Sequence, residues 1–437
     1  MHSSKLVGRG LATGALTLAL GVTACGGEQG GGGGGGAQGG GGQPRNVQFD
    51  MTIGDLVPLS GDLSVFGPPG QAAADLAVQE INQAAQQAGV RTNVRVEHAD
   101  TETQAQAAVQ GARQLISGGA NCLAGAWASA STLAVAESVA SRQRVPLISP
   151  ASTSAEITAL DDNGLVWRTA PSDNLQARAL ADTVEQELGG TNFTLSLAAR
   201  NDAYGQGFIQ QFGQAWQQKG GRVTGPVLYD PEQPNYNSEA QEIVSGNPNA
   251  YVIIDFPETY ARMGAALERT GNFDASKMFT ADGLAADEIP EEVPAQSLAG
   301  TRGTRPGTPE EGQVVQQFSQ AYRQTGEERG TFDAQNFDAV MLCYLAAVAA
   351  GKADGQAISQ NLQAVSGPPG TKYDFTQLPQ AIKALAAGED IDFQGVTGPI
   401  DFDQNGDPTT ATYEVYRYGP DDGQLEVLRQ FQAQQGG

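Results

Sequence analysis

The sequence predicts an α/β protein made of two doubly wound units in tandem. Short apolar segments typical of strands alternate with helical stretches from Met51 onward, and this order produces parallel sheets with helices on both faces. The alternation restarts after residues 168–171, which indicates a second unit. The chain has 437 residues, of which 40% are hydrophobic, so it can supply two cores of ordinary domain size.

The first unit begins with the strand-like segment 51–57. A helix is expected over 70–88, because apolar residues recur there at the spacing of one helical face. These residues are Ala73, Leu76, Ala77, Ile81, Ala84 and Ala88. A strand that ends at Asp100 and a helix over 103–117 follow. The remaining expected elements are a strand over 120–126, a helix over 131–143 and a strand over 145–150.

The second unit is expected to contain four strands separated by helical stretches. These strands are 193–200, 223–230, 250–256 and 277–283. A helix-rich segment over 309–388 and a candidate hairpin, TYEVYRY to QLEVLRQF, complete the chain. Periodicity alone does not assign these last two parts to either unit.

The net charge excludes two classes of partner. The chain has 25 Lys and Arg against 49 Asp and Glu, which gives a formal charge of −24. A nucleic-acid-binding protein needs a basic face to neutralise phosphates, so we expect no nucleic-acid partner. Anionic lipid headgroups would repel the same charge, so a position at a membrane would require a covalent anchor.

The first 25 residues are typical of a secretory signal. Lys5 and Arg9 precede an apolar run over 11–20, which is too short to span a bilayer permanently. The small residues before Cys25 resemble a bacterial lipobox, which implies that Cys25 becomes the lipidated first residue of the mature protein. The Gly- and Gln-rich segment 26–45 is predicted to be a flexible tether with a reach of about 25 Å. We therefore expect an exported protein, lipid-anchored at the outer face of the membrane or on the periplasmic side; the alternative is an ordinary secretory signal with an incidental cysteine.

Enzymatic motifs are missing from the sequence. It has no G-x-S-x-G elbow, no phosphate-binding P-loop and no C-x-x-C pair, and two His and three Cys are too few for a zinc finger. The segment 205–207 lacks the third glycine of a dinucleotide fingerprint. The segment 401–408 (DFDQNGDP) resembles a calcium loop, but the later Glu is absent and Pro408 interrupts it, so a solvated turn is favoured. We expect no enzymatic activity, no cofactor and no metal site.

Five segments in combination carry a resemblance to a known family. They are LVPLSGDLSVFG (56–67), AWASASTLAVAES (126–138), PLISPASTSAEIT (146–158), NDAYGQGF (201–208) and GPIDFDQNGDP (398–408). From about residue 46 onward the chain resembles the solute-binding lipoproteins of ABC importers, of the branched-chain amino-acid (Leu/Ile/Val)-binding type. This resemblance implies the type I periplasmic-binding-protein fold: two Rossmann-like lobes, joined by three crossover segments, that close around a ligand like a Venus flytrap.

The resemblance also implies how the chain is divided between the lobes. The crossover segments would fall near 168–171, 301–306 and 397–402. The first lobe would then combine residues 46–170 with 304–398, and the second would combine 171–303 with 399–437. This division assigns the helix-rich segment to the first lobe and the hairpin to the second.

An amino acid in the cleft needs hydrogen-bond donors for its carboxylate. Ser129 precedes the helix expected from 131, and Thr153 precedes a helix expected at Ala155. Unpaired N–H groups at a helix start favour an anion, and the resemblance places family ligand contacts at the same two residues. We expect Ser129 and Thr153 to bind the carboxylate; the alternative is that both are plain N-caps.

The ammonium group and the side chain of an amino acid need different surroundings. Asp282 follows a strand at its carboxyl end, where open α/β sheets bind ligands, and the backbone carbonyl of Ala151 is a second candidate acceptor. Tyr204 matches a tyrosine that the opposing lobe contributes in the family. The side-chain pocket is expected to be walled by aromatic residues, for which ordinary core packing is the alternative. These residues are Phe66, Trp127, Phe256 and Phe332.

Two cysteines remain besides Cys25. Cys122 lies on an expected strand and Cys343 on an expected helix, both assigned to the first lobe. An exported protein can keep a disulfide, but the sequence does not give the distance between the two residues, so a bonded and a free pair remain alternatives.

Together these features predict a monomeric receptor for a small solute. We expect it to capture an amino acid of the branched-chain type, or a similar small polar solute, and to deliver it to the membrane permease of an ABC importer. The alternatives are the ligand-sensing domain of a signalling system and a binder of amides, urea or aromatic acids. The lipid bilayer would be a further partner through Cys25.

Overall fold

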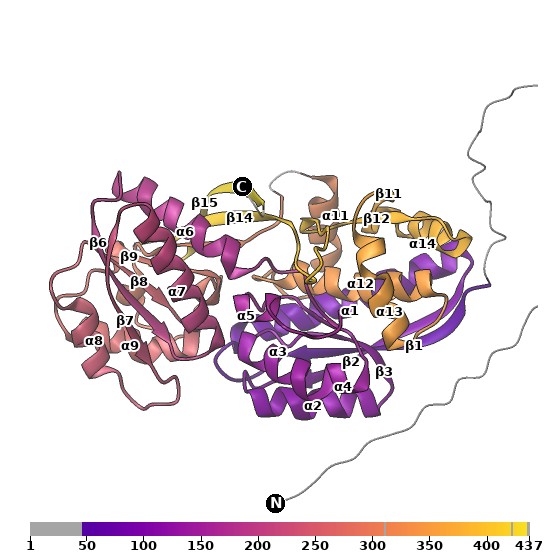
Figure 1. Cartoon of the computed structure of the whole chain (residues 1–437), viewed down its shortest axis with the longest axis horizontal. Coiled ribbons are helices and arrows are strands. Elements are labelled where there is room, and N and C mark those ends of the chain that lie inside the picture. Colours follow the sequence, from indigo (N-terminus) through magenta and orange to yellow (C-terminus); the bar gives the residue numbers. More distant parts are fainter. Residues whose placement is uncertain (1–45, 310–311, 421–422, 435–437) are drawn as a thin grey trace, which may run out of the picture. The chain divides into compact units, whose positions relative to one another are not determined.

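The computed structural model describes residues 46–309, 312–420 and 423–434, and it contains two central sheets with helices on both faces (Figure 1). The α/β class that the alternation of strands and helices predicted is confirmed. The expected signal, the tether and Cys25 lie outside the described residues. We call the five-stranded sheet with its helices the first lobe, and the seven-stranded sheet with its helices the second lobe.

The first lobe is built on a parallel sheet in the order β2-β1-β3-β4-β5. Its strands are β1 (Gln48–Val57), β2 (Arg91–Asp100), β3 (Ala120–Ala124), β4 (Leu147–Ser149) and β5 (Val166–Arg168). Its N-terminal helices are α1 (Gly67–Ala88), α2 (Ala105–Ser117), α3 (Ser129–Val135), a π-helical turn (Ala136–Ala140), α4 (Ser141–Gln143) and α5 (Ala155–Thr158). The helix expected from residue 131 thus begins two residues earlier, at Ser129.

The helix-rich segment packs on the first lobe, as the family division implied. Its helices are α11 (Gln313–Tyr322), α12 (Asp333–Ala350), α13 (Gly355–Ser366) and α14 (Leu378–Ala387), and its small sheet contains β11 (Thr371–Asp374), β12 (Ile391–Gly395) and β13 (Gly398–Pro399). Helix α12 lies against α1 and β3, and it is buried along most of its length. Cys343 on α12 forms a disulfide with Cys122 on β3, with 6.0 Å between their Cα atoms.

The second lobe contains a mixed sheet in the order β15-β14-β10-β9-β8-β6-β7. Its strands are β6 (Thr194–Arg200), β7 (Arg222–Tyr229), β8 (Ala250–Ile254), β9 (Met278–Thr280), β10 (Arg302–Pro306), β14 (Thr410–Tyr418) and β15 (Leu425–Gln434). Its helices are α6 (Asp173–Leu188), α7 (Ala203–Gln218), α8 (Asn237–Val244), α9 (Pro257–Arg269) and α10 (Ala295–Leu298). Five strands are parallel, and the expected hairpin, β14–β15, adds antiparallel strands at the β10 edge.

Strands buried on both faces explain the continuous apolar runs in the sequence. In β8, Val252 and Ile254 face the core beneath α6 and α7, whereas Tyr251 and Ile253 face the core beneath α8 and α9. Alternate residues therefore need the same apolar character. This is why these segments were recognisable as strands, although they lack a polar and an apolar side.

The division between the lobes differs from the expected one at the second crossover. The expected boundary between residues 303 and 304 falls inside β10, because Thr304 and Pro306 still pair with β14. The strand belongs entirely to the second sheet, so this crossover begins after Pro306. Periodicity could not reveal the position, because it depends on pairing with a strand more than 100 residues away.

A buried ion pair joins the first crossover to the third. Arg168, at the end of β5, donates from Nε to Asp407 Oδ1 at 2.6 Å, and its second bond to Oδ2 measures 2.8 Å. Asp403 accepts from the N–H groups of Asn405 and Asp407, as expected for a turn. Asp407 itself is fully buried, so the solvated turn expected over 401–408 is wrong at this residue. Its bidentate contact with Arg168 explains the burial, because a buried carboxylate needs a matched cation.

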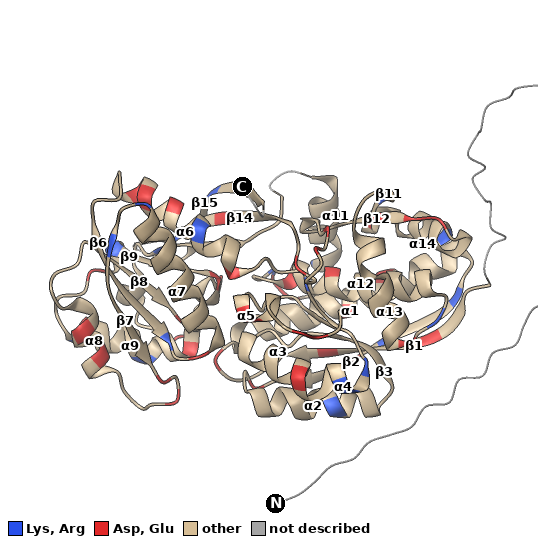
Figure 2. Ribbon diagram, in the orientation of Figure 1, with Lys and Arg blue, Asp and Glu red and all other residues tan. Residues whose placement is uncertain are grey.

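The acidic excess is spread over helices and loops of both lobes and forms no single cluster (Figure 2). Within the described chain, no single helix is long and apolar enough to cross a membrane; α12 and α13, bent by 104° from each other, would meet that test only as a pair, by length and composition.

Candidate functional site

A largely enclosed pocket lies between the two lobes, and in this closed arrangement its cavity volume is about 20 Å³. Residues from the ends of several strands line it, where doubly wound sheets place their sites. The lining residues are Leu63, Phe66, Trp127, Ser129, Ala151, Tyr204, Phe256, Asp282, Gly283 and Phe332. Eight of the nine residues that the sequence suggested for ligand binding are therefore brought together around one pocket, and Thr153 is the exception.

The first lobe contributes an aromatic wall with an unusual backbone. Trp127 and Phe332 meet edge to face, with 6.3 Å between ring centroids and 89° between their planes. Both have left-handed backbone angles, with φ of 68° and 71°, which a bulky residue adopts only where its surroundings hold it there. Both side chains are almost fully buried. The wall is therefore held in a strained conformation, as is common where a protein contacts a ligand.

The second lobe contributes a stack of aromatic rings with a cation behind it. Tyr204, on α7, stacks on Phe256, with 5.2 Å between centroids and 13° between planes. The guanidinium of Arg200 lies 3.8 Å from the Phe256 ring centroid. The Tyr204 hydroxyl accepts from the N–H of Gly283 at 3.0 Å and donates to Asp282 Oδ1 at 3.3 Å.

Asp282 provides a buried acceptor in the lining of the pocket. It begins a 3-10 turn (Asp282–Leu284) that follows β9 after one intervening residue, and Gln176 Nε2 donates to its Oδ1 at 2.7 Å. Burial raises the pKa of Asp282 to about 7, despite the hydrogen bonds from Gln176 and Tyr204. The carboxylate would be better stabilised with a cationic partner than it is by these neutral donors.

Asp173, which the sequence reasoning missed, lies near Asp282. It is the first residue of α6, it is fully buried, and neither carboxylate oxygen has a hydrogen-bond partner among the described residues. Burial and the charge of Asp282 raise the pKa of Asp173 well above its usual value. In the sequence this residue is indistinguishable from an acidic residue that stabilises a helix start.

Thr153 lies behind the pocket, next to Asp173, and does not line the pocket. Its carbonyl accepts from the N–H of Asp173 at 2.7 Å. Its hydroxyl is close enough to lower the pKa of Asp173, yet the two groups fall short of hydrogen-bond geometry. The helix after it, α5, is capped by Ser154, whose hydroxyl accepts from the N–H of Glu156.

Ser129 provides a hydroxyl in the lining of the pocket. It begins the continuous helical run of 129–143, so N–H groups at this start have no partner within the helix. Its Oγ accepts from the N–H of Ser154 at 3.2 Å, which leaves the hydroxyl hydrogen to donate to a ligand. Ser129 is the first residue of α3, whose N-cap is Ala128, so the alternative that Ser129 is a plain N-cap is wrong. Its side chain links instead to the segment that carries Ala151 and Thr153.

Direct bonds between the lobes lie beside the pocket residues Leu63 and Phe256. Asp62 of the first lobe accepts from Arg200 at 3.0 Å and from the Thr259 hydroxyl at 2.8 Å, both in the second lobe. Ser64 donates to Glu258 at 2.8 Å in the same region. The lobes are thus closed on each other.

The arrangement favours binding over catalysis. The lining combines the acceptors Asp282 and the carbonyl of Ala151 with the hydroxyl of Ser129 and with five aromatic side chains from the two lobes. The lining contains no His, Cys or Lys that could act as a nucleophile or base. No group of three or more His, Cys, Asp or Glu within the described ranges is placed to hold a metal ion. The chemistry of this lining matches a small solute with a cationic group and an apolar body, for which the lobes would have to move apart slightly.

Comparisons with known proteins agree with this geometry. Residues 50–424 match the model of the family described as periplasmic binding protein. A chemotactic signal transduction system substrate-binding protein, BasB, from Halobacterium salinarum is 25% identical over 378 residues, which cover 83% of this chain and 85% of that protein.

Two solved structures show the same fold. The branched-chain amino acid transporter substrate-binding protein LivJ from Streptococcus pneumoniae, in complex with isoleucine, has a TM-score of 0.70 at 21% identity and covers 88% of this chain and 99% of its own. A solute-binding protein of an ABC transporter from R. palustris, in complex with 4-hydroxybenzoate, has a TM-score of 0.68 at 16% identity and covers 88% of this chain and 98% of its own. The chain therefore belongs to the periplasmic binding protein family.

Proposed function

We propose that this protein binds a small α-amino acid with an apolar side chain in the pocket between its lobes. The observation that carries the proposal is the pairing of a buried, cation-seeking carboxylate, Asp282, with a hydroxyl donor, Ser129, in one aromatic-walled pocket. A zwitterionic solute needs both kinds of group in its pocket, because its ammonium requires hydrogen-bond acceptors and its carboxylate requires hydrogen-bond donors. Micromolar affinity corresponds to about −8 kcal/mol, which a few charge-assisted hydrogen bonds and one buried side chain can supply.

The ammonium group would lie at the acidic end of the pocket. Asp282 and the carbonyl of Ala151 are acceptors in the lining. The ligand carboxylate would accept from Ser129 and from N–H groups at the start of α3. The side chain would lie among Phe66, Trp127 and the other rings.

A role in transport would require the protein to act at a membrane. Membership of the family implies a location outside the cytoplasm. We infer that Cys25 carries a lipid, that segment 26–45 tethers the folded part to the bilayer, and that closure of the lobes around the solute prepares delivery to an ABC permease. A ligand stabilises the closed form, because only that form contacts it from both lobes.

Isothermal titration calorimetry with matched solutes tests the binding proposal. L-Leucine is compared with 4-methylpentanoate, which lacks the ammonium, with 3-methylbutylamine, which lacks the carboxylate, and with benzoate. We expect measurable binding of L-leucine and weaker or absent binding of the other three, because each lacks one polar end. Tight binding of benzoate or 4-methylpentanoate without any binding of L-leucine would show that the solute is an organic acid.

Three variants make this test specific to the site. Asp282→Asn and Ser129→Ala are each expected to weaken L-leucine binding by at least about tenfold, as expected for loss of one charge-assisted hydrogen bond. Ser117→Ala is the matched control, because that exposed hydroxyl bonds only to the carbonyl of Gln114 in its own helix. Equal affinity in all three variants would remove these two residues from the site.

A second candidate function is supported by one comparison. The relative that covers 83% of this chain is named as a substrate-binding protein of a chemotactic signal transduction system. A receptor of this kind would report ligand occupancy to a signalling partner. Deletion of the gene distinguishes the two roles: loss of solute uptake supports transport, whereas normal uptake with lost movement toward the solute supports sensing.

A further inference from the structure

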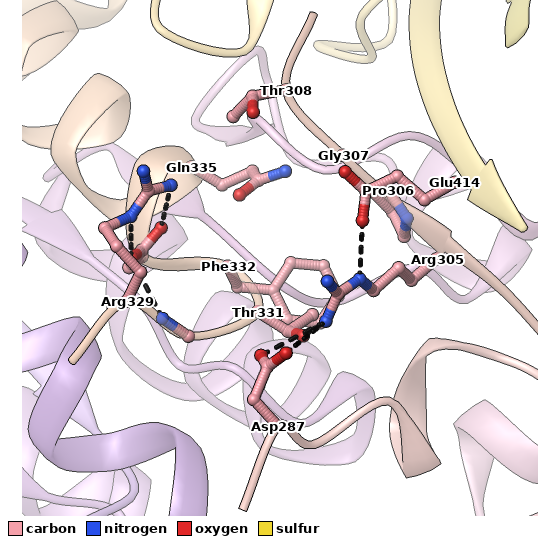
Figure 3. Close-up of a pocket in the computed structure, with 12 residues that line it drawn as sticks. Asp287, Arg305, Pro306, Gly307, Thr308, Arg329, Thr331, Phe332, Gln335 and Glu414 are labelled. Carbon is pink, nitrogen blue, oxygen red and sulfur yellow. Dashed lines mark hydrogen bonds and ion pairs between the residues drawn. The ribbon is translucent and has the colours of Figure 1, made fainter. Parts of the chain in front are cut away.

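A second, open hollow has a volume of about 210 Å³ (Figure 3) and shares one lining residue with the solute pocket. Its lining is polar and charged. The residues are Asp287, Arg305, Pro306, Gly307, Thr308, Arg329, Gly330, Thr331, Phe332, Asp333, Gln335 and Glu414. The hollow is thus formed by residues of both lobes, as the solute pocket is.

Phe332 is the residue, among those described, that lines both spaces. The two spaces also share neighbouring chain segments. Asp282 and Gly283 line the solute pocket, whereas Asp287 lines the hollow. The hydroxyl of Thr331 bonds to the carbonyl of Ala285, so the segment that carries Phe332 is attached to this second segment between the two spaces. The ring of Phe332 therefore forms part of a thin common wall.

The structure holds this ring in place from both sides. Arg305 Nη1 donates to the Thr331 hydroxyl at 2.8 Å, and Arg329 forms a bidentate ion pair with Asp333. The residues immediately before and after Phe332 are thus anchored, while Phe332 itself has a left-handed backbone with φ of 71°. A phenylalanine in this conformation carries a strain that a glycine would avoid. A strained aromatic residue between two spaces indicates a role in separating them.

We propose that Phe332 is a partition that limits the length of the solute, so that the receptor accepts short apolar side chains and rejects those long enough to reach the charged hollow. This inference rests on the proposed function, because it takes the aromatic-walled pocket as the solute site. It identifies one residue that separates a short class of solutes from a long class.

The chemistry of the hollow predicts which long solute a partition variant would accept. The lining contains the carboxylates of Asp287, Asp333 and Glu414, but only the two guanidinium groups of Arg305 and Arg329. Gln335 is 3% exposed, its side-chain amide has no protein partner among the described residues, and it points into the hollow (Figure 3). Arg305 pairs with both Asp287 and Glu414, so two carboxylates share one cation. A cationic tail would give these carboxylates a second partner and would donate to the amide oxygen of Gln335. L-Arginine is the appropriate probe, because its main chain resembles that of L-leucine and its side chain is longer and cationic.

The experiment compares L-leucine and L-arginine, by calorimetry, on the unmodified protein and on three variants. Phe332→Ala and Phe332→Gly both remove the ring, and the glycine also relieves the backbone strain, so that at least one well-folded variant is expected. Phe66→Ala is the matched control, because it enlarges the same pocket but does not line the hollow. The unmodified protein should prefer L-leucine, and both Phe332 variants should gain about tenfold or more in affinity for L-arginine, as one added charge-assisted contact would produce.

Asp287→Asn in the Phe332→Ala background then shows where the tail lies. The gain for L-arginine should largely disappear, because Asp287 lines the hollow and not the solute pocket. The proposal is overturned if neither Phe332 variant gains affinity for L-arginine, if Phe66→Ala gains as much, or if the gain survives the Asp287 change. Failure of the proposed function has a different signature, since the unmodified protein would then bind no L-leucine.

Discussion

Asp62 is expected to set the affinity of the receptor although it does not line the pocket. Its side chain links the lobes through Arg200 and Thr259, and it is 18% exposed. Hydrogen bonds to charged groups contribute about 1.5–3 kcal/mol each. In Asp62→Asn, Arg200 keeps its contacts with Asp202 and Asp255, so no charge is left unpaired. We therefore expect a net loss of about 2 kcal/mol from the closed state, which corresponds to about 30-fold weaker binding.

Stopped-flow fluorescence and calorimetry with one solute give the affinity and the two rate constants. The loss should appear mainly as faster dissociation, because the contacts of Asp62 exist only when the lobes are closed. Relative affinities for different solutes should stay the same, because the pocket is unchanged. Asp50→Asn is the control, since Asp50 is exposed on β1 of the same lobe. Unchanged affinity in Asp62→Asn, or a loss confined to one solute, would refute the reasoning.

Three further predictions concern titration and packing. Because burial raises the pKa of Asp282 to about 7, affinity for an amino acid should rise with pH up to about 7 and then level off, as calorimetry at several pH values would show; Asp282→Asn should remove the rise. Burial alone would lower the pKa of His98. Its hydrogen bonds to Asp55 and Asp75 instead raise this pKa to about 10, compared with 6.5 in the unfolded chain. The stability that protonated His98 provides is fully present below pH 6.5 and is lost as the pH rises towards 10. The loss in unfolding free energy is at most about 1.4 kcal/mol per pH unit. Urea unfolding at several pH values should show this dependence in the unmodified protein and not in His98→Gln. Gly70→Ala would place a Cβ 2.2 Å from the ring of Trp127, so we expect a loss of about 1–3 kcal/mol in unfolding free energy and weaker solute binding.

Local patterns in the sequence were sufficient for the features that depend on neighbouring residues. The strand and helix alternation follows from apolar periodicity, and Asp282 could be placed at a sheet edge because it closely follows a strand. Ser129 was recognised in the same way, from its position at a helix start. The aromatic residues around the pocket followed from the family resemblance, and the structure gathers them.

Features that depend on distant residues could not be predicted in this way. Asp407 looked like a turn residue, because its partner Arg168 is 239 residues away in the sequence. Asp173 looked like a helix-start residue, because only the folded chain brings it near Asp282. The left-handed backbone of Phe332 also had no signal, since a bulky aromatic residue is disfavoured there and tertiary contacts impose the conformation.

The disulfide lies in only one of the two lobes, so the two lobes are expected to take part in solute binding at different stages. Cys122 lies five residues before Trp127, and Cys343 lies on the helix that begins just after Phe332, so one covalent bond braces both strained rings of the first lobe. We expect the disulfide to hold the shape of that face when the lobes move apart. The solute would therefore bind first to the preformed surface of the first lobe, and the second lobe would then close over it. This order of binding would require an oxidising environment, in which the disulfide persists. Reducing conditions would break it and loosen the first lobe, while the crossover segments would be unaffected.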